Sequence, residues 1–134
     1  MAYLLDTSAW LTHLFGETGI LEVRRVFNEP QSQVFVSALS LLEVHTRLKA
    51  LHKEKNWPAI YKTYTALFSK ILPVDEQVAQ TAIQLRAATP LRLPAIDGLI
   101  AATAVVHNLM LVHRDAHLAS IPAELLRQVR LPER

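Results

Sequence analysis

The chain has 134 residues, with 14 lysines and arginines against 12 aspartates and glutamates, and it contains no cysteine. A chain of this length is expected to fold as a single domain over residues 1–134 that buries about 70% of its unfolded surface. The lack of cysteine excludes disulfides and thiolate metal sites, so a bound metal would need oxygen or imidazole ligands. The formal net charge of +2 permits an anionic partner without requiring one.

The N-terminus and the most apolar segment argue against export and membrane insertion. The chain begins Met-Ala-Tyr-Leu-Leu-Asp, with no basic residue before the apolar run, which is unlike a signal peptide. Residues 96–106 form the most apolar long stretch, but Asp97 interrupts it and it is far shorter than the ~20 residues of a spanning helix. We therefore expect a cytoplasmic protein that does not enter a membrane.

Short apolar runs alternate with helical patterns along the whole chain. Strands are predicted at 2–5, 34–36, 71–74 and 109–112, with Pro73 favouring an edge position for the third. Helices are predicted at 7–15, from 20 to about 28, from 38 to about 51 with Ser37 as N-cap, and at 57–69, 75–88 and 95–107. Residues 113–118 are predicted to form a polar turn, followed by a basic tail. This alternation predicts an α/β fold, a three-layer α/β/α sandwich with a central, mainly parallel sheet of four to five strands.

Four acids are expected at one edge of this sheet. In a parallel sheet, residues that directly follow strands gather at the carboxyl edge. Asp6 follows the first strand, and Glu43 lies in the second turn of the helix after the second strand. Asp115 lies three residues beyond the fourth strand. Asp97 is in the first turn of the helix that leads into the fourth strand, and that helix must start at the same edge.

Each acid also has a simpler interpretation. Asp6 could only cap the helix that begins at Thr7, and Glu43 could pair with Arg47 in an exposed bridge worth ~0.3–0.5 kcal/mol. Asp97 is harder to explain in this way, because its helix is apolar nearly all round and a buried carboxylate is costly without a partner. A hard divalent ion, Mg²⁺ or Mn²⁺, would compensate a cluster of carboxylates.

Four segments, in order, resemble the PIN domain, and in particular the VapC-type toxins of type II toxin–antitoxin systems. They are Leu4 to Ser8, Ser40 to Glu43, Leu93 to Ala104 and Leu111 to Asp115. The resemblance implies that residues 1–134 form a single PIN-like nuclease domain. It also implies a homodimer and a small cognate antitoxin whose C-terminal segment lies across the active groove.

By this resemblance, an acidic quartet would hold Mg²⁺ in a ribonuclease, and Thr7 or Ser8 would assist through a hydroxyl. The quartet is Asp6, Glu43, Asp97 and Asp115. Such proteins often carry Ser or Thr where this chain has His113, and a further acid where it has His117. The resemblance therefore leaves open whether one or two metal ions bind, and what position 113 does.

The expected activity is hydrolysis of RNA by a metal-activated water. The candidates for RNA contact are Arg114, His117, Lys49, Lys53 and Arg92, although lysines at a helix end are often only solvated and His117 could simply pack. One alternative makes Asp6 the covalent nucleophile of a phosphohydrolase, but those enzymes usually need a second acid where Ser8 stands. Another is a catalytically silent module that binds RNA or protein, which has no physical need to bury four acids.

Overall fold

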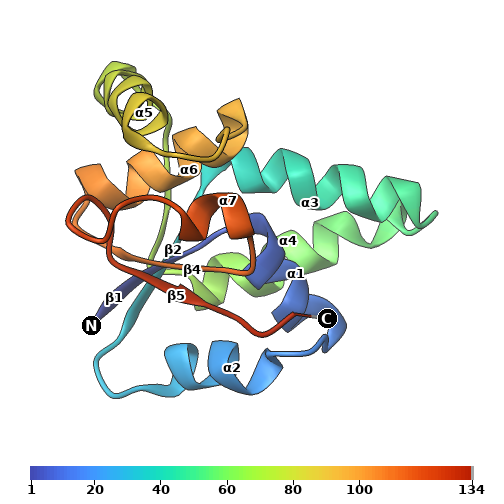
Figure 1. The fold of residues 1–134 in the computed structure, drawn as a ribbon. Helices are drawn as coiled ribbons and strands as arrows, with labels where there is room; N and C mark the ends of the chain where they lie inside the picture. The colour runs from blue at the N-terminus through green and yellow to red at the C-terminus, as the bar shows by residue number, and fades with distance from the viewer. Residues whose placement is uncertain (134) are drawn as a thin grey trace.

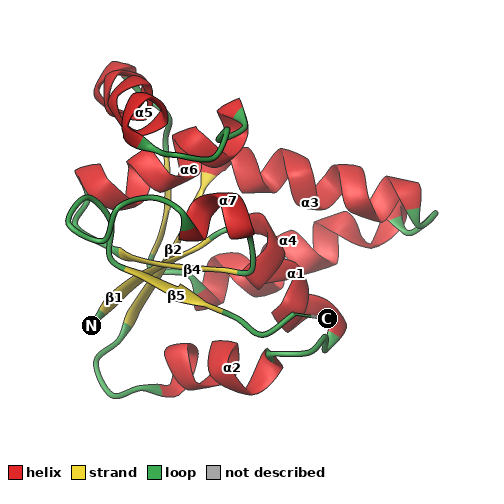
Figure 2. Cartoon of the chain, in the orientation of Figure 1, coloured by secondary structure: helices red, strands yellow, loops and turns green. Residues whose placement is uncertain are grey.

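The computed structural model describes residues 1–133, and a five-stranded parallel sheet in the order β3-β2-β1-β4-β5 forms its centre (Figures 1 and 2). The strands are β1 Ala2–Leu5, β2 Gln33–Ser37, β3 Lys70–Leu72, β4 Met110–His113 and β5 Gln128–Arg130. The helices are α1 Thr7–Phe15, α2 Ile20–Asn28, α3 Ala38–Ala50, α4 Trp57–Leu67, α5 Glu76–Ala88, α6 Ala95–Val106 and α7 Ala116–Ala119, with a 3-10 turn η1 at Glu54–Asn56. Among the described residues, no helix has the length and apolar character needed to span a membrane.

Helices cover both faces of the sheet, which explains why its central strands contain continuous apolar runs, such as Tyr3 to Leu5 in β1 and Met110 to Val112 in β4. Along β1, Tyr3 and Leu5 pack in a core with residues of α1, α2, α3 and α4. Leu4 points to the other face and packs with residues of α5, α6 and α7. Figure 1 shows α5 and α6 above the sheet and α2 below it. The predicted three-layer α/β/α sandwich is confirmed.

The register of the sheet brings the ends of the three central strands level. Leu5, the last residue of β1, pairs with Val36 of β2 and with Val112 of β4. The next backbone N–H, that of Asp6, donates to the carbonyl oxygen of Val112 at 3.0 Å. The residues that leave these strands therefore start from one edge. The edge position predicted for the third strand is also confirmed, because β3 pairs only with β2 in the described sheet.

The C-terminal quarter differs from the prediction in three respects. His113 is the last residue of β4 instead of the first residue of a turn. Residues 116–119 form the short helix α7, because the Asp115 side chain accepts hydrogen bonds from the backbone at His117 and Leu118. The predicted basic tail contains β5, in which Val129 pairs with Val112 of β4.

Candidate active site

The four predicted acids line one cleft at the carboxyl edge of the sheet. The cleft has a volume of about 610 Å³. Its lining residues are Asp6, Thr7, Ser8, Leu11, Glu43, Asp97, Ile100, Arg114, Asp115, Ala116, Arg130 and Glu133. Topology alone predicted that acids from four separate parts of the chain would meet here, and the structure brings all of them together with both hydroxyl residues.

Asp6 is buried, with 6% of its surface exposed, and it caps α1. Its Oδ1 accepts a hydrogen bond from the backbone N–H of Ala9 at 2.8 Å and from Ser8 Oγ at 2.7 Å. Both bonds use the same oxygen, so the second carboxylate oxygen receives no hydrogen bond from residues 1–133. The capping interpretation is thus confirmed, and it leaves one oxygen of Asp6 for another partner.

Burial raises the pKa of Asp6 from 3.8 to about 7. The hydrogen bonds from Ser8 and Ala9 oppose this rise because they favour the ionised form, while the negative charges of Asp97 and Asp115 add to it. At neutral pH this carboxyl group therefore pays a desolvation penalty that its own hydrogen bonds do not cancel.

Asp97 is half-buried in the first turn of α6, and it does not cap that helix. The N-cap is Pro94, and no side chain makes a cap hydrogen bond there. Burial, followed by the charges of Asp115 and Glu43, raises the pKa of Asp97 to about 6, against an opposing effect of His117. Capping therefore does not account for Asp97, whereas a position among other carboxylates does.

Glu43 joins the cleft through a chain of hydroxyl groups. Thr7 Oγ1 donates to Glu43 Oε1, and Ser40 Oγ lies 3.0 Å from Thr7 Oγ1. Because Thr7 has a single hydroxyl proton and gives it to Glu43, Ser40 is the donor of the second bond. The alternative ion pair between Glu43 and Arg47 is not formed among the described residues. The contacts of Glu43 thus point into the site.

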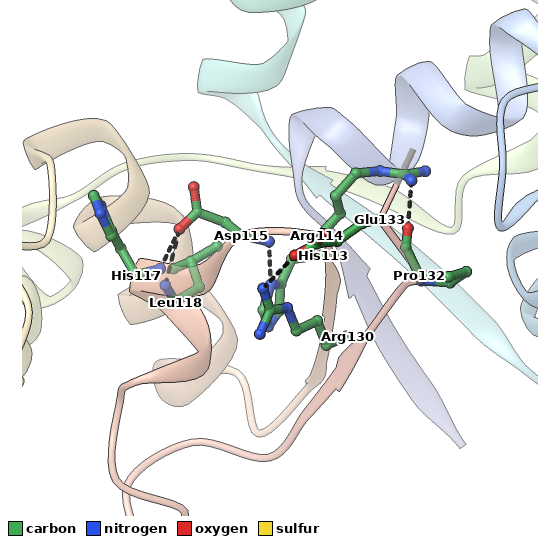
Figure 3. A network of polar contacts seen from close by, with 8 residues as sticks. All are labelled: His113, Arg114, Asp115, His117, Leu118, Arg130, Pro132 and Glu133. Carbon is green, nitrogen blue, oxygen red and sulfur yellow. Dashed lines mark hydrogen bonds and ion pairs between the residues drawn. The ribbon is translucent and has the colours of Figure 1, made fainter.

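Asp115 is held in the same way as Asp6. Its Oδ1 accepts the backbone N–H groups of His117 at 2.6 Å and Leu118 at 3.1 Å, which caps α7 (Figure 3). Its own backbone N–H donates to His113 Nδ1 at 3.0 Å. Asp6 and Asp115 therefore each fix one carboxylate oxygen on a helix end and keep the other free of hydrogen bonds within the described chain.

The side chains of the cleft fit a hard cation in their chemistry. Carboxylates and hydroxyls are the oxygen ligands that Mg²⁺ and Mn²⁺ prefer, and the mutual charge effects on Asp6 and Asp97 are those that a cation would relieve. Within residues 1–133, no three His, Asp or Glu side chains stand close enough to enclose a metal ion by themselves. This agrees with Mg²⁺ sites in which one or two carboxylates bind an ion that keeps several waters.

Of the predicted RNA-contacting residues, Arg114 alone lines the cleft. Its guanidinium donates to Thr12 Oγ1 at 2.5 Å, to the Thr18 carbonyl at 2.5 Å and to the Pro132 carbonyl at 2.6 Å. These contacts tie together α1, the turn before α2 and the C-terminal segment. Arg114 therefore lines the cleft and also acts as a clamp, by which we mean that its hydrogen bonds hold these three segments together.

The other predicted basic residues lie outside the cleft. His117 is exposed, but it is near enough to Asp97 to oppose the rise in its pKa. Lys53 Nζ lies 5.8 Å from the centroid of the Phe15 ring. Lys49 and Arg92 are exposed on the surface.

Sequence reasoning missed two charged residues of the cleft, Arg130 and Glu133. They form an ion pair in which Arg130 Nη2 lies 3.6 Å from Glu133 Oε1 (Figure 3), and 42% of the Arg130 side chain and 85% of the Glu133 side chain are exposed. Because Arg130 is on β5, its place in the site depends on a strand in the segment that the sequence predicts to be a basic tail. The only sequence signal was the basic character of that segment.

Comparison with known proteins identifies the fold. The model of the PIN domain family matches residues 3–124. No curated protein matches. Among solved structures, the chain is similar to a toxin–antitoxin complex from Klebsiella pneumoniae, with 26% identity, 95% of each chain covered and a TM-score of 0.69.

Two other structures have higher TM-scores and lower identity. VapBC2 from Rickettsia felis, bound to a DNA fragment from its promoter, is 17% identical over 98% of this chain and 100% of that chain, with a TM-score of 0.79. DNA-bound VapBC from Salmonella typhimurium is 20% identical over 97% of this chain and 98% of that chain, with a TM-score of 0.75. At such identities the likeness concerns the fold, whereas the family model spans most of the sequence. This chain belongs to the PIN domain family.

Proposed function

We propose that this chain is a Mg²⁺-dependent endoribonuclease and the toxin of a type II toxin–antitoxin pair. One observation carries the proposal: carboxylates from four separate parts of the chain line one cleft, and two of them have raised pKa values. Membership of the PIN family and likeness to solved toxin–antitoxin complexes support it.

Asp6, Glu43, Asp97 and Asp115 would hold the cation together, one or two of them directly and the others through the waters that it keeps, and Mn²⁺ could replace Mg²⁺. When bound, such an ion supplies Lewis-acid activation of a water and neutralises negative charge at the phosphate. The free oxygens of Asp6 and Asp115 are the ones available for this role, because their other oxygens are engaged in helix capping.

The remaining steps belong to the side chains of the cleft. A carboxylate of this quartet that the cation does not fully engage would accept a proton from the attacking water. Thr7 and Ser8 orient Glu43 and Asp6 through their hydroxyls. Arg130, whose ion-pair partner Glu133 is exposed, would guide the phosphodiester backbone into the cleft.

The proposal includes partners of this chain. The similar Klebsiella pneumoniae structure is a toxin–antitoxin complex, so a small antitoxin protein is the expected inhibitor here. A homodimer is expected from the family resemblance, and the cytoplasm is the compartment in which an RNA-cleaving toxin would act. Copurification of this chain with the product of a small adjacent reading frame would test the antitoxin directly.

The experiment is RNA cleavage by the purified chain in Mg²⁺ and in EDTA, comparing the parent with Asp97→Asn. We expect cleavage only with Mg²⁺, and at least about a 100-fold loss in the variant. Asp75→Asn is the matched control, because Asp75 caps α5 outside the cleft lining and asparagine can keep that hydrogen bond.

Three outcomes would contradict the proposal. If Asp97→Asn folds and cuts as fast as the parent, the metal-nuclease mechanism is wrong. If the parent binds RNA in Mg²⁺ without cutting it, the chain is a binding module. If a phosphorylated aspartate can be trapped on Asp6, the chain is a covalent phosphohydrolase.

A further inference from the structure

His113 is completely buried at the end of β4, and both of its ring nitrogens are hydrogen-bonded. The backbone N–H of Asp115 lies 3.0 Å from Nδ1, and Gln128 Oε1 lies 2.6 Å from Nε2. A backbone N–H can only donate, so Nδ1 is the acceptor and the neutral ring carries its proton on Nε2. Nε2 then donates to Gln128 Oε1. The two neighbours therefore fix one tautomer of His113.

Gln128 is itself held in one orientation. Its Nε2 donates to the carbonyl oxygen of Ile121 at 3.4 Å, which leaves its Oε1 facing His113. Gln128 belongs to β5, beyond residue 124, where the match to the family model ends. Strand β5 is secured to β4 by the pairing of His113 with Arg130, and the Leu131 N–H donates to the His113 carbonyl at 2.6 Å.

These contacts hold the backbone of Asp115 from the side opposite to its carboxylate. Figure 3 shows the imidazole of His113 beneath the Asp115 backbone N–H, while the carboxylate turns toward α7. The backbone N–H of Asp115 is held by His113, and its Oδ1 is held by the N-terminus of α7. Together these two sets of hydrogen bonds fix the direction of Oδ2, the second carboxylate oxygen of Asp115.

We propose that His113, oriented by Gln128, is a positioning residue that aims the Asp115 carboxylate into the cleft. Strand β5, which the family model does not cover, thereby contributes a second residue to the site besides Arg130. What the aimed carboxylate then does, binding a divalent cation, rests on the proposed function.

A buried histidine that only fills space could be replaced by an apolar residue of similar size at little cost to the site. Here a leucine would leave the Asp115 N–H and Gln128 Oε1 without their partners. An asparagine would behave differently, because its Oδ1 can occupy the place of Nδ1 and accept the Asp115 N–H. The two substitutions therefore distinguish the effect of the hydrogen bond to the Asp115 N–H from the effect of side-chain volume at position 113.

The experiment compares the parent with His113→Leu, His113→Asn and Gln128→Leu, with His107→Leu at an exposed position as the control. We expect His113→Leu to weaken Mn²⁺ binding, measured by calorimetry, about 10- to 100-fold. His113→Asn should regain most of the lost Mn²⁺ affinity. Gln128→Leu keeps Nδ1 of His113 as an acceptor but no longer fixes the ring, so its Mn²⁺ affinity should lie between those of the parent and His113→Leu. Nitrogen-15 NMR of the parent should show Nδ1 unprotonated and Nε2 protonated.

Two results would overturn the positioning role: a folded His113→Leu chain that binds Mn²⁺ as tightly as the parent, or a parent spectrum with the proton on Nδ1. Should the parent bind no Mn²⁺, the proposed function fails by itself. Hydrogen exchange of the Asp115 backbone N–H then tests the positioning role without a metal. If His113 holds this N–H, it should exchange at least about tenfold faster in Gln128→Leu and in His113→Leu than in the parent. Equal exchange rates would overturn it.

Discussion

Asp6→Asn should make the metal-free protein more stable at alkaline pH. The folded protein raises the pKa of Asp6 from 3.8 to about 7, chiefly by burial. Between these two values the folded state holds a proton on Asp6 that the unfolded state has lost, so the contribution of Asp6 to stability falls as pH rises from about 4 to about 7 and is constant above. At about 1.4 kcal/mol per pKa unit, Asp6 lowers the free energy of unfolding at pH 8 by about 4 kcal/mol relative to pH below 4.

Asparagine removes this penalty and keeps the cap, because its Oδ1 can still accept the hydrogen bonds of Ala9 and Ser8. We expect Asp6→Asn to raise the free energy of unfolding by about 2–4 kcal/mol at pH 8 and by much less at pH 4.5. Urea unfolding in EDTA at both pH values measures this. Asp75→Asn, at an exposed cap outside the cleft lining, should change little at either pH.

The same pair of proteins tests the cation. Mg²⁺ at about 100 times its dissociation constant should stabilise the parent by about 2.7 kcal/mol at pH 8 and stabilise Asp6→Asn by less. An Asp6→Asn protein no more stable than the parent in EDTA at pH 8 would refute the argument, because burial of the charged carboxylate would then cost nothing.

Three further substitutions address the frame of the cleft. Arg114→Met removes the hydrogen bonds to Thr12, Thr18 and Pro132 and should lower the free energy of unfolding by about 2 kcal/mol in urea; an unchanged midpoint would contradict the clamp. Gly19→Ala should cost about 1–2 kcal/mol in the same assay, because Gly19 has φ +96° and a Cβ would lie 3.3 Å from Pro132 Cδ. Arg130→Gln should reduce the steepness of the plot of log RNA affinity against log salt concentration by about 0.7, because one phosphate contact is lost. An unchanged slope would exclude a contact between Arg130 and an RNA phosphate.

The fold and the place of the site could be predicted because they follow from strong local signals. Runs such as Leu4-Leu5 and Leu111-Val112 are apolar at successive positions, as strands covered on both faces require. Once the sheet is parallel, the chain must leave Asp6, Asp97 and Asp115 at the carboxyl edge. Four acids could therefore be assigned to one cleft without any side-chain coordinates.

The parts that could not be predicted depend on weak patterns or on distant contacts. The three residues of β5, Gln128, Val129 and Arg130, contain one apolar side chain, so no periodicity marks them as a strand. Their pairing with β4 brings Arg130 to the cleft and Gln128 to His113. Arg114 was predicted to contact RNA from its charge alone; its hydrogen bonds to residues far away in the sequence become visible only in three dimensions.

The proposed function depends on the binding of a hard divalent cation in the carboxylate cleft. Anomalous diffraction from crystals of the parent soaked in Mn²⁺ tests it most directly, with Asp97→Asn crystals soaked in parallel. We expect a manganese peak in the parent cleft within about 2.0–2.3 Å of oxygens from Asp6, Asp97 or Asp115, and a weakened peak in the variant. A fully soaked parent crystal with no peak among these carboxylates would contradict it.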